Sequence, residues 1–120
     1  MIKDFKDLIV WQRAMELVTE VYRLVKKLPN EERFALSDQI RRSAISIPSN
    51  IAEGQGRNST KEFIHFLSIA KGSKAELETQ LLLGVKINYL TNLEIETSMK
   101  LIQEVGKMLN ALQKSLKSKL

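Results

Sequence analysis

Few side chains in this sequence have the types and spacing that covalent or metal chemistry requires. The chain has no cysteine, and its single histidine, His65, follows Glu62 at the Glu-x-x-His spacing of helical di-metal sites. Those sites need two such units on separate helices, and this sequence has one. Glu62 is also explained as the third residue of a helix that Ser59 caps. We therefore predict no catalytic residue, no metal site, no cofactor and no small-molecule substrate.

The stretch from Ser46 to Gly54 is the most unusual part of the sequence. It places Pro48 inside a strongly helical region, where a proline removes one backbone hydrogen bond and costs about 3 kcal/mol. Beside the apolar stripe of this helix runs a polar row at spacings of three and four, made of Gln39, Ser43, Ser46, Asn50, Glu53 and Arg57. The row is either a flank that is solvated or bonded to a neighbouring helix, or a seam at a subunit interface or binding groove.

Basic side chains offer a different chemistry, the binding of a polyanion. Arg41 and Arg42 share a predicted helix with the polar row, and three lysines recur every seven residues near the C-terminus. No acidic residue follows position 104. These lysines either complement the helix dipole and keep the surface soluble, or contact phosphates in a salt-dependent way. The candidate nucleic-acid contacts are Arg41, Arg42, Arg57, Lys100, Lys107, Lys114 and Lys117.

Four helical segments must position these side chains. Apolar residues recur at helical spacing over about 8–28, 30–53, 60–89 and 91–116. Pro29 ends the first segment, and we predict Asn30 as the N-cap of the second. Gly54-Gln55-Gly56 ends the second segment. Ser59 and Thr91 are each followed three residues later by glutamate, which is the capping-box pattern for the third and fourth helices.

The connections between these segments are short, so successive helices should run antiparallel. We predict an all-α, up-down-up-down four-helix bundle that forms a single domain over residues 1–120. The first helix carries two apolar rows. One is Trp11, Met15, Val18, Tyr22 and Val25, and the other is Val10, Ala14, Leu17, Val21, Leu24 and Leu28. Two rows form a face wide enough for two neighbours, so we expect the bundle to self-associate.

The overall composition fits a soluble protein. The formal net charge is +5, and no stretch approaches the roughly 18 uninterrupted apolar residues of a membrane span. Charged residues precede any apolar run at the N-terminus, unlike a signal peptide. We expect a cytoplasmic protein with no membrane partner.

Several motifs occur together along the chain. They are Asp7-Leu8 with Trp11-Gln12, the segments 32–36, 39–43 and 46–54, and Gly72-Ser73 with the segment 76–81. In combination they resemble the four-helix-bundle family named after proteins encoded in intervening sequences of bacterial 23S rRNA genes. The resemblance covers essentially the whole chain. The accessory variability protein of diversity-generating retroelements resembles the same family.

The resemblance implies a homopentamer and a role in binding RNA or a nucleoprotein partner. Within the shared motifs, Arg41, Arg42, Asn50 and Glu53 are the best site candidates, and Trp11, Ser46 and Pro48 belong to the same motifs. The predicted function is a non-enzymatic, homo-oligomeric helical protein that binds structured RNA or a nucleoprotein. The alternative is an assembly or adaptor protein whose ring presents a protein-binding surface and contacts no nucleic acid.

Overall fold

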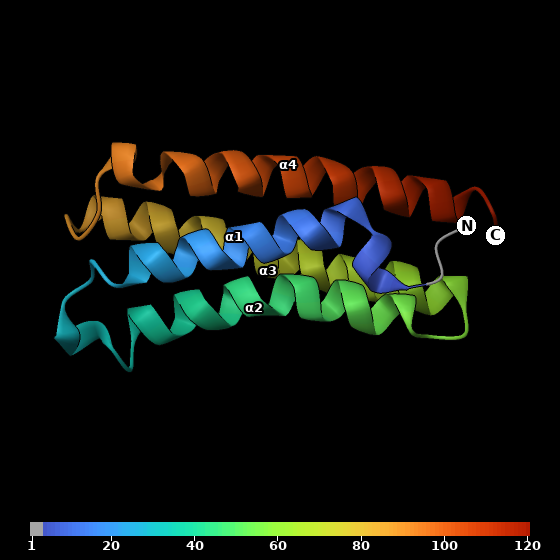
Figure 1. Cartoon of the computed structure of the whole chain (residues 1–120), viewed down its shortest axis with the longest axis horizontal. Helices are drawn as coiled ribbons and strands as arrows, with labels where there is room; N and C mark the ends of the chain where they lie inside the picture. The colour runs from blue at the N-terminus through green and yellow to red at the C-terminus, as the bar shows by residue number, and fades with distance from the viewer. Residues whose placement is uncertain (1–3) are drawn as a thin grey trace.

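The computed structural model describes residues 4–120, and within this range it contains four α-helices and no strand. The helices are α1 (Ile9–Val25), α2 (Leu36–Gln55), α3 (Thr60–Lys86) and α4 (Asn92–Lys117). Two short 3-10 helices, η1 (Phe5–Asp7) and η2 (Asn30–Glu32), precede α1 and α2. The four long helices lie side by side in a molecule of 46 × 24 × 19 Å (Figure 1). The all-α fold predicted from helical periodicity is confirmed.

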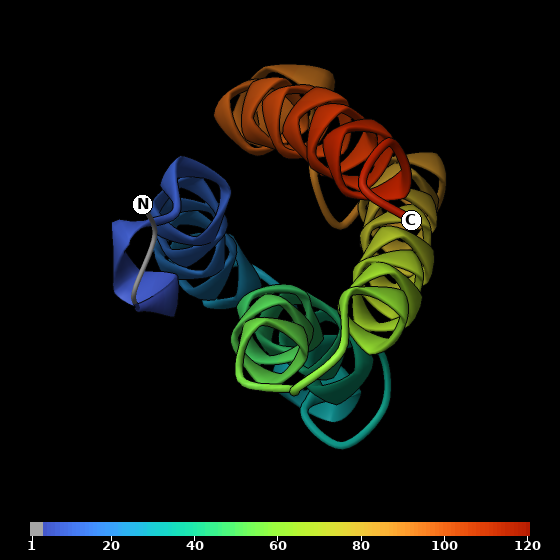
Figure 2. The same ribbon diagram turned by 90° about the vertical axis from the view of Figure 1, so that its right-hand side faces the viewer.

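Each long helix packs against two others. α1 contacts α2 and α4, and α3 also contacts α2 and α4, so that α2 and α4 are not neighbours. Figure 2 shows the four helices arranged around a common centre. Apolar side chains from every helix fill that centre, and their removal from water is the main stabilising contribution to the fold. Fully buried examples are Leu17, Ile40, Ile47, Ile51, Leu67, Leu77, Leu81, Ile102 and Leu109.

The two predicted apolar rows of α1 differ in burial. The inner row, from Val10 to Leu28, is buried throughout. In the outer row, Met15 is 43% exposed and Tyr22 41% exposed, whereas Val25 is buried against the core. An apolar strip on α1 therefore remains open to solvent in the single chain.

α2 begins later than the sequence analysis predicted. Asn30 is the first residue of η2, and α2 begins at Leu36 after Ala35 as its N-cap. The backbone at Pro29 is extended, and three turns follow it. The last turn ends at Ala35, which has φ −120° and ψ −104° and directly precedes α2. The predicted N-cap at Asn30 is wrong because the chain uses these residues to turn the corner between α1 and α2.

The caps of α3 and α4 follow the predicted pattern to different extents. At α4, the Thr91 hydroxyl accepts from the Glu94 N–H, and the Glu94 carboxylate accepts from the Thr91 N–H, which completes a capping box. At α3, Ser59 accepts from the Glu62 N–H at 3.0 Å. The helix starts are thus fixed by local hydrogen bonds.

None of the helices in residues 4–120 combines the length and the apolarity needed to cross a bilayer.

Candidate functional site

Part of the predicted polar row bonds to a neighbouring helix of the same chain. The Ser46 hydroxyl lies 2.8 Å from the Ser73 hydroxyl of α3. The Asn50 amide donates to the Ser46 carbonyl at 2.8 Å and to the Ser46 hydroxyl at 2.9 Å. These contacts pair Ser46 and Asn50 within a single chain, and the Ser46–Ser73 contact lies between α2 and α3.

The end of the same row lies at the surface. Glu53 and Arg57 form an ion pair at 3.2 Å, with side chains 55% and 43% exposed. The Arg57 guanidinium also lies over the Phe66 ring of α3, 4.8 Å from its centroid. Because Glu53 partly neutralises its charge, Arg57 is a weaker candidate for binding a phosphate than the sequence suggested.

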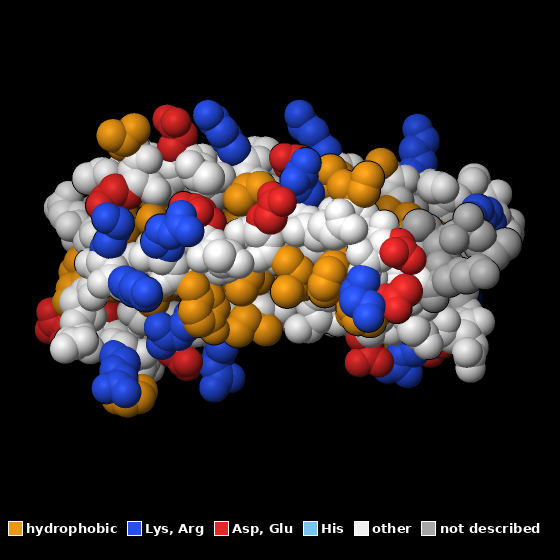
Figure 3. All heavy atoms as spheres, in the orientation of Figure 1, with side chains coloured by type: hydrophobic (Ala, Val, Ile, Leu, Met, Phe, Trp, Pro, Cys, Tyr) orange, Lys and Arg blue, Asp and Glu red, His pale blue; other side chains and the backbone are white. Residues whose placement is uncertain are grey.

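Pro48 lies in the middle of α2, and the helix continues through it from Leu36 to Gln55. Its buried ring lines an open hollow of about 340 Å³ between α1 and α2. We call this hollow the α1/α2 apolar groove; its lining residues are Trp11, Met15, Val18, Ile45, Pro48, Ser49 and Ala52. Trp11 at one end packs edge-on against Phe5, with ring centroids 5.3 Å apart. Figure 3 shows hydrophobic side chains gathered over these two helices.

Two further candidate cations are already ion-paired. Arg42 bonds to Asp38 at 3.0 Å, and Lys100 lies 3.6 Å from Glu96. Both pairs join residues four apart on one helix and are exposed, so each contributes little to stability. Each nevertheless places a carboxylate beside the cation, which weakens its attraction for a phosphate.

Lys107 lies in a different environment, a hollow of about 330 Å³ between α3 and α4. We call it the α3/α4 lysine groove; it is lined by Lys71, Lys74, Ala75, Gln103, Gly106, Lys107 and Asn110. Three ammonium-bearing side chains from two helices therefore surround one hollow, and no carboxylate lines it.

Neighbouring residues hold two of these lysines in place. Lys71 donates to the Gln113 side-chain oxygen at 3.2 Å. Gln113 is buried on α4, and its amide donates to the Ile64 carbonyl and the Ser68 hydroxyl of α3. The Lys74 side chain lies across Gly106, where an added Cβ would be 3.2 Å from the Lys74 Nζ. Lys71 and Lys74 were not among the residues predicted from the sequence, although both flank the small buried residue Ser73.

Lys114 and Lys117 continue the basic surface toward the end of α4. Both are exposed, and neither forms an ion pair within the described residues 4–120. Lys107 and Lys114 are separated by two helical turns, or about 10 Å along the axis. Figure 3 shows basic side chains projecting along the α4 edge of the molecule.

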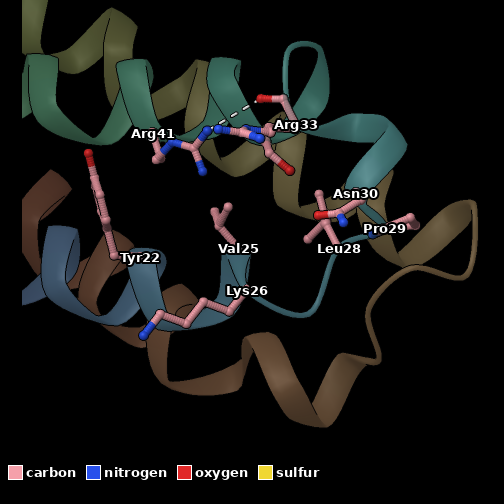
Figure 4. Close-up of a pocket in the computed structure, with 9 residues that line it drawn as sticks. Tyr22, Val25, Lys26, Leu28, Pro29, Asn30, Arg33 and Arg41 are labelled. Carbon is pink, nitrogen blue, oxygen red and sulfur yellow. Dashed lines mark hydrogen bonds between the residues drawn. The ribbon is translucent and has the colours of Figure 1, made fainter.

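Arg41 lies apart from these lysines, at the corner between α1 and α2. Its guanidinium donates to the Arg33 carbonyl at 3.3 Å. It lines an open pocket of about 420 Å³ together with Tyr22, Lys26 and Arg33 (Figure 4). Because α2 and α4 are not neighbours, the structure does not bring Arg41 together with the α4 lysines.

The residues considered for metal chemistry are not gathered into a site. His65 is exposed on α3, and its ring packs edge-on against Phe66. Among residues 4–120, no group of three or more His, Cys, Asp or Glu side chains is arranged to hold a metal ion.

Comparisons with known proteins agree on the family. The family model described as 23S rRNA-intervening sequence protein matches residues 6–111. Among solved structures, the chain is similar to a protein with unknown function from the S23 ribosomal protein family of Bacteroides thetaiotaomicron. The two are 33% identical over 88% of this chain and 99% of that chain, with a TM-score of 0.81. No curated protein matches this chain. The family match extends from η1 through most of α4, and this chain therefore belongs to the 23S rRNA-intervening sequence protein family.

Proposed function

We propose that this protein is a non-enzymatic, self-assembling helical bundle that binds structured RNA, or an RNA–protein particle, through the α3/α4 lysine groove. The observation that carries the proposal is the convergence of Lys71, Lys74 and Lys107 on one hollow without a lining carboxylate. Neither the family description nor that of the similar structure refers to a catalytic activity.

The chemistry of the groove suits a phosphate backbone better than a single base. Its cations attract phosphates, while the Gln103 and Asn110 amides can bond to phosphate or sugar oxygens without reading the sequence. Within residues 4–120, Glu78 is the one carboxylate paired with these lysines, at 3.8 Å from Lys74, which is a long and weak contact. Lys114 and Lys117 extend the path for the backbone beyond the groove.

Self-assembly is supported by the α1/α2 apolar groove. Met15 and Ile45 on its walls are 43% and 42% exposed in the single chain. All of its lining side chains except Ser49 are apolar, and covering such a surface is favourable. In the homopentamer implied by the family resemblance, five lysine grooves would act together, and their combined affinity would exceed that of one.

Within each subunit we propose the antiparallel, up-down-up-down arrangement of helices. The contact pattern supports it, since every helix packs on its sequence neighbours and α1 also packs on α4. The short connections between α2 and α3 and between α3 and α4 favour it as well.

The alternative is an adaptor that uses the α1/α2 apolar groove for another protein and binds no nucleic acid. The predominance of apolar lining in that groove favours this reading over a role in RNA contact. The two functions predict different results for RNA binding. An adaptor assembles normally but does not bind RNA even at low salt.

The RNA hypothesis is tested by titrating a fluorescent structured RNA at two salt concentrations. Binding should weaken steeply with salt, and Lys107→Gln combined with Lys114→Gln should lower the affinity roughly tenfold near 0.15 M salt. Lys6→Gln with Lys86→Gln removes the same charge outside the groove, and this control should lose much less affinity. Absence of binding at low salt, or equal losses in both double variants, contradicts the proposal. Light scattering that reports a monomer contradicts the assembly.

A further inference from the structure

We infer that the pocket at the α1–α2 corner is a separate site for a nucleotide, which it holds by the phosphate and by the base. We call it the corner pocket; its polar lining consists of Tyr22, Lys26, Asn30, Arg33, Ser37 and Arg41. It lies on α1 and α2, whereas the lysine groove lies on α3 and α4, so the inference does not rest on RNA binding at the groove.

The ion pairs of the molecule single out this pocket. Four of the six arginines form ion pairs with carboxylates: Arg13, Arg23, Arg42 and Arg57. Within residues 4–120, the two arginines without a carboxylate within 4.0 Å are Arg33 and Arg41, and both line the corner pocket. Lys26, on the opposite wall, has no ion pair in the same range either. Three uncompensated positive charges thus surround one hollow.

The two guanidinium groups are positioned without being neutralised. Arg41 is partly buried, and its one side-chain hydrogen bond within residues 4–120 goes to the neutral carbonyl of Arg33 at 3.3 Å. The Arg33 guanidinium lies over the ring of Phe34, 5.1 Å from its centroid. Figure 4 shows the Arg41 guanidinium between Tyr22 and Arg33, above Val25. The remaining N–H groups of Arg41 are free to donate two parallel bonds to a phosphate.

The carboxylates that lie nearby in the sequence do not line the pocket. Glu31 and Glu32 precede Arg33, but neither lines the pocket. Within residues 4–120, no ion pair joins either of them to Arg33, Arg41 or Lys26. Asp38 on α2 is paired with Arg42. The pocket therefore keeps its positive character despite the acidic residues around it.

The pocket also has room and an aromatic wall for a base. Its volume of about 420 Å³ lies in the range of about 300–1,000 Å³ for small-molecule sites. Tyr22 is 41% exposed, and its ring forms one wall, while Val25 and Leu28 supply apolar contacts. An exposed aromatic ring beside unpaired arginines suits a ligand with both a planar base and a phosphate. Such a group is a free mononucleotide or the 5′-phosphorylated end of an RNA strand.

The test is calorimetric titration of the full chain with adenosine 5′-monophosphate, adenosine and inorganic phosphate. We expect the nucleotide to bind more tightly than either part. Arg33→Gln and Arg41→Gln should each reduce nucleotide affinity at least tenfold. Tyr22→Leu should reduce it by on the order of fivefold and leave phosphate binding unchanged. Arg42→Gln, which alters an adjacent, ion-paired arginine, is the matched control and should bind normally.

Short RNAs with a 5′-phosphate or a 5′-hydroxyl separate the two sources of the nucleotide. Preference for the phosphorylated RNA identifies a strand end, and equal binding of the two RNAs with retained binding of the monophosphate identifies a free nucleotide. The Lys107→Gln, Lys114→Gln variant should bind the monophosphate as the native chain does. No heat of binding with a folded chain, or unchanged affinity in Arg41→Gln, overturns the inference and leaves the proposed RNA groove unaffected.

Discussion

The hydroxyl oxygens of Ser46 and Ser73 lie 2.8 Å apart and join the middle of α2 to the middle of α3. Asn50 adds two hydrogen bonds to Ser46 on the same side of α2. One hydrogen bond between short polar side chains thus joins two helices of one chain, and Asn50 supports it from α2. This relationship separates the structural part of the polar row from the Glu53–Arg57 pair at its exposed end.

The first prediction concerns the two halves of that row. Asn50→Ala should lower the free energy of unfolding by about 1 kcal/mol, because it removes hydrogen bonds in a partly buried setting. Glu53→Ala should change it by less than about 1 kcal/mol, because the ion pair that it removes is exposed to water. Urea unfolding of both variants measures these values. A change of oligomeric state in Asn50→Ala at unchanged stability would instead place Asn50 in a subunit interface.

The second prediction compares two glycines. A Cβ on Gly54 would lie 2.7 Å from the Phe66 Cβ and 3.0 Å from the Phe63 Cδ1, so α2 and α3 would have to separate. Gly54→Ala should therefore cost about 1–3 kcal/mol of stability. Gly72 on α3 has no neighbouring atom within 4 Å of such a Cβ. Gly72→Ala should stabilise the fold by about 0.5–1 kcal/mol, and thermal melting of both variants tests the contrast.

The third prediction is a pH dependence at the start of α4. The pKa of Glu94 is lowered, first by the Thr91 N–H, then by Lys27. A carboxylate with a lowered native pKa stabilises the fold above its unfolded pKa, and this contribution disappears as the pH falls through the native value. Melting temperatures should therefore fall as the pH drops below the ordinary glutamate value of 4.5. Glu94→Gln should fall less steeply over that range. Parallel pH curves for the two proteins contradict this assignment.

Sequence periodicity was sufficient to predict the all-α class and the four helices, because apolar residues recur at helical spacing in each segment. The inner row of α1 and the capping box at Thr91 depend on local spacing, and both have the predicted form. Asn30 was misassigned because its residue type suits both a helix cap and a tight turn, and the backbone around Pro29 decides between them.

The candidate site was harder to predict than the fold. Lys71 and Lys74 lie on α3, and their proximity to Lys107 depends on which face of α3 meets α4. Arg42 and Asp38 are four residues apart, a spacing that allows a pair on one helix. That Arg33 and Arg41 have no carboxylate partner within residues 4–120 can be seen only in the folded chain. Spacing along one helix is predictable from the sequence, whereas contact between helices depends on packing.

The last prediction concerns Pro48. A proline has no N–H to donate, so the Ala44 carbonyl lacks its helical partner, yet α2 continues without interruption. Pro48→Ala restores that hydrogen bond and a residue of high helix propensity, a gain of up to about 3 kcal/mol. It also removes ring methylenes, each contributing about 0.8 kcal/mol when buried. We expect a net gain in the stability of the single subunit, measured by urea unfolding at low protein concentration.

If copies of the chain meet at the α1/α2 apolar groove as proposed, the same substitution should weaken self-association, since the Pro48 ring lines that groove with Trp11 and Met15. Sedimentation over a range of protein concentrations measures this effect. Ser49→Ala, at the neighbouring position in the groove, is the control, because it removes one hydroxyl and should leave both association and stability nearly unchanged. A less stable subunit with unaltered association would show that the proline ring is needed to fill the space between α1 and α2, and that the groove is not where copies of the chain meet.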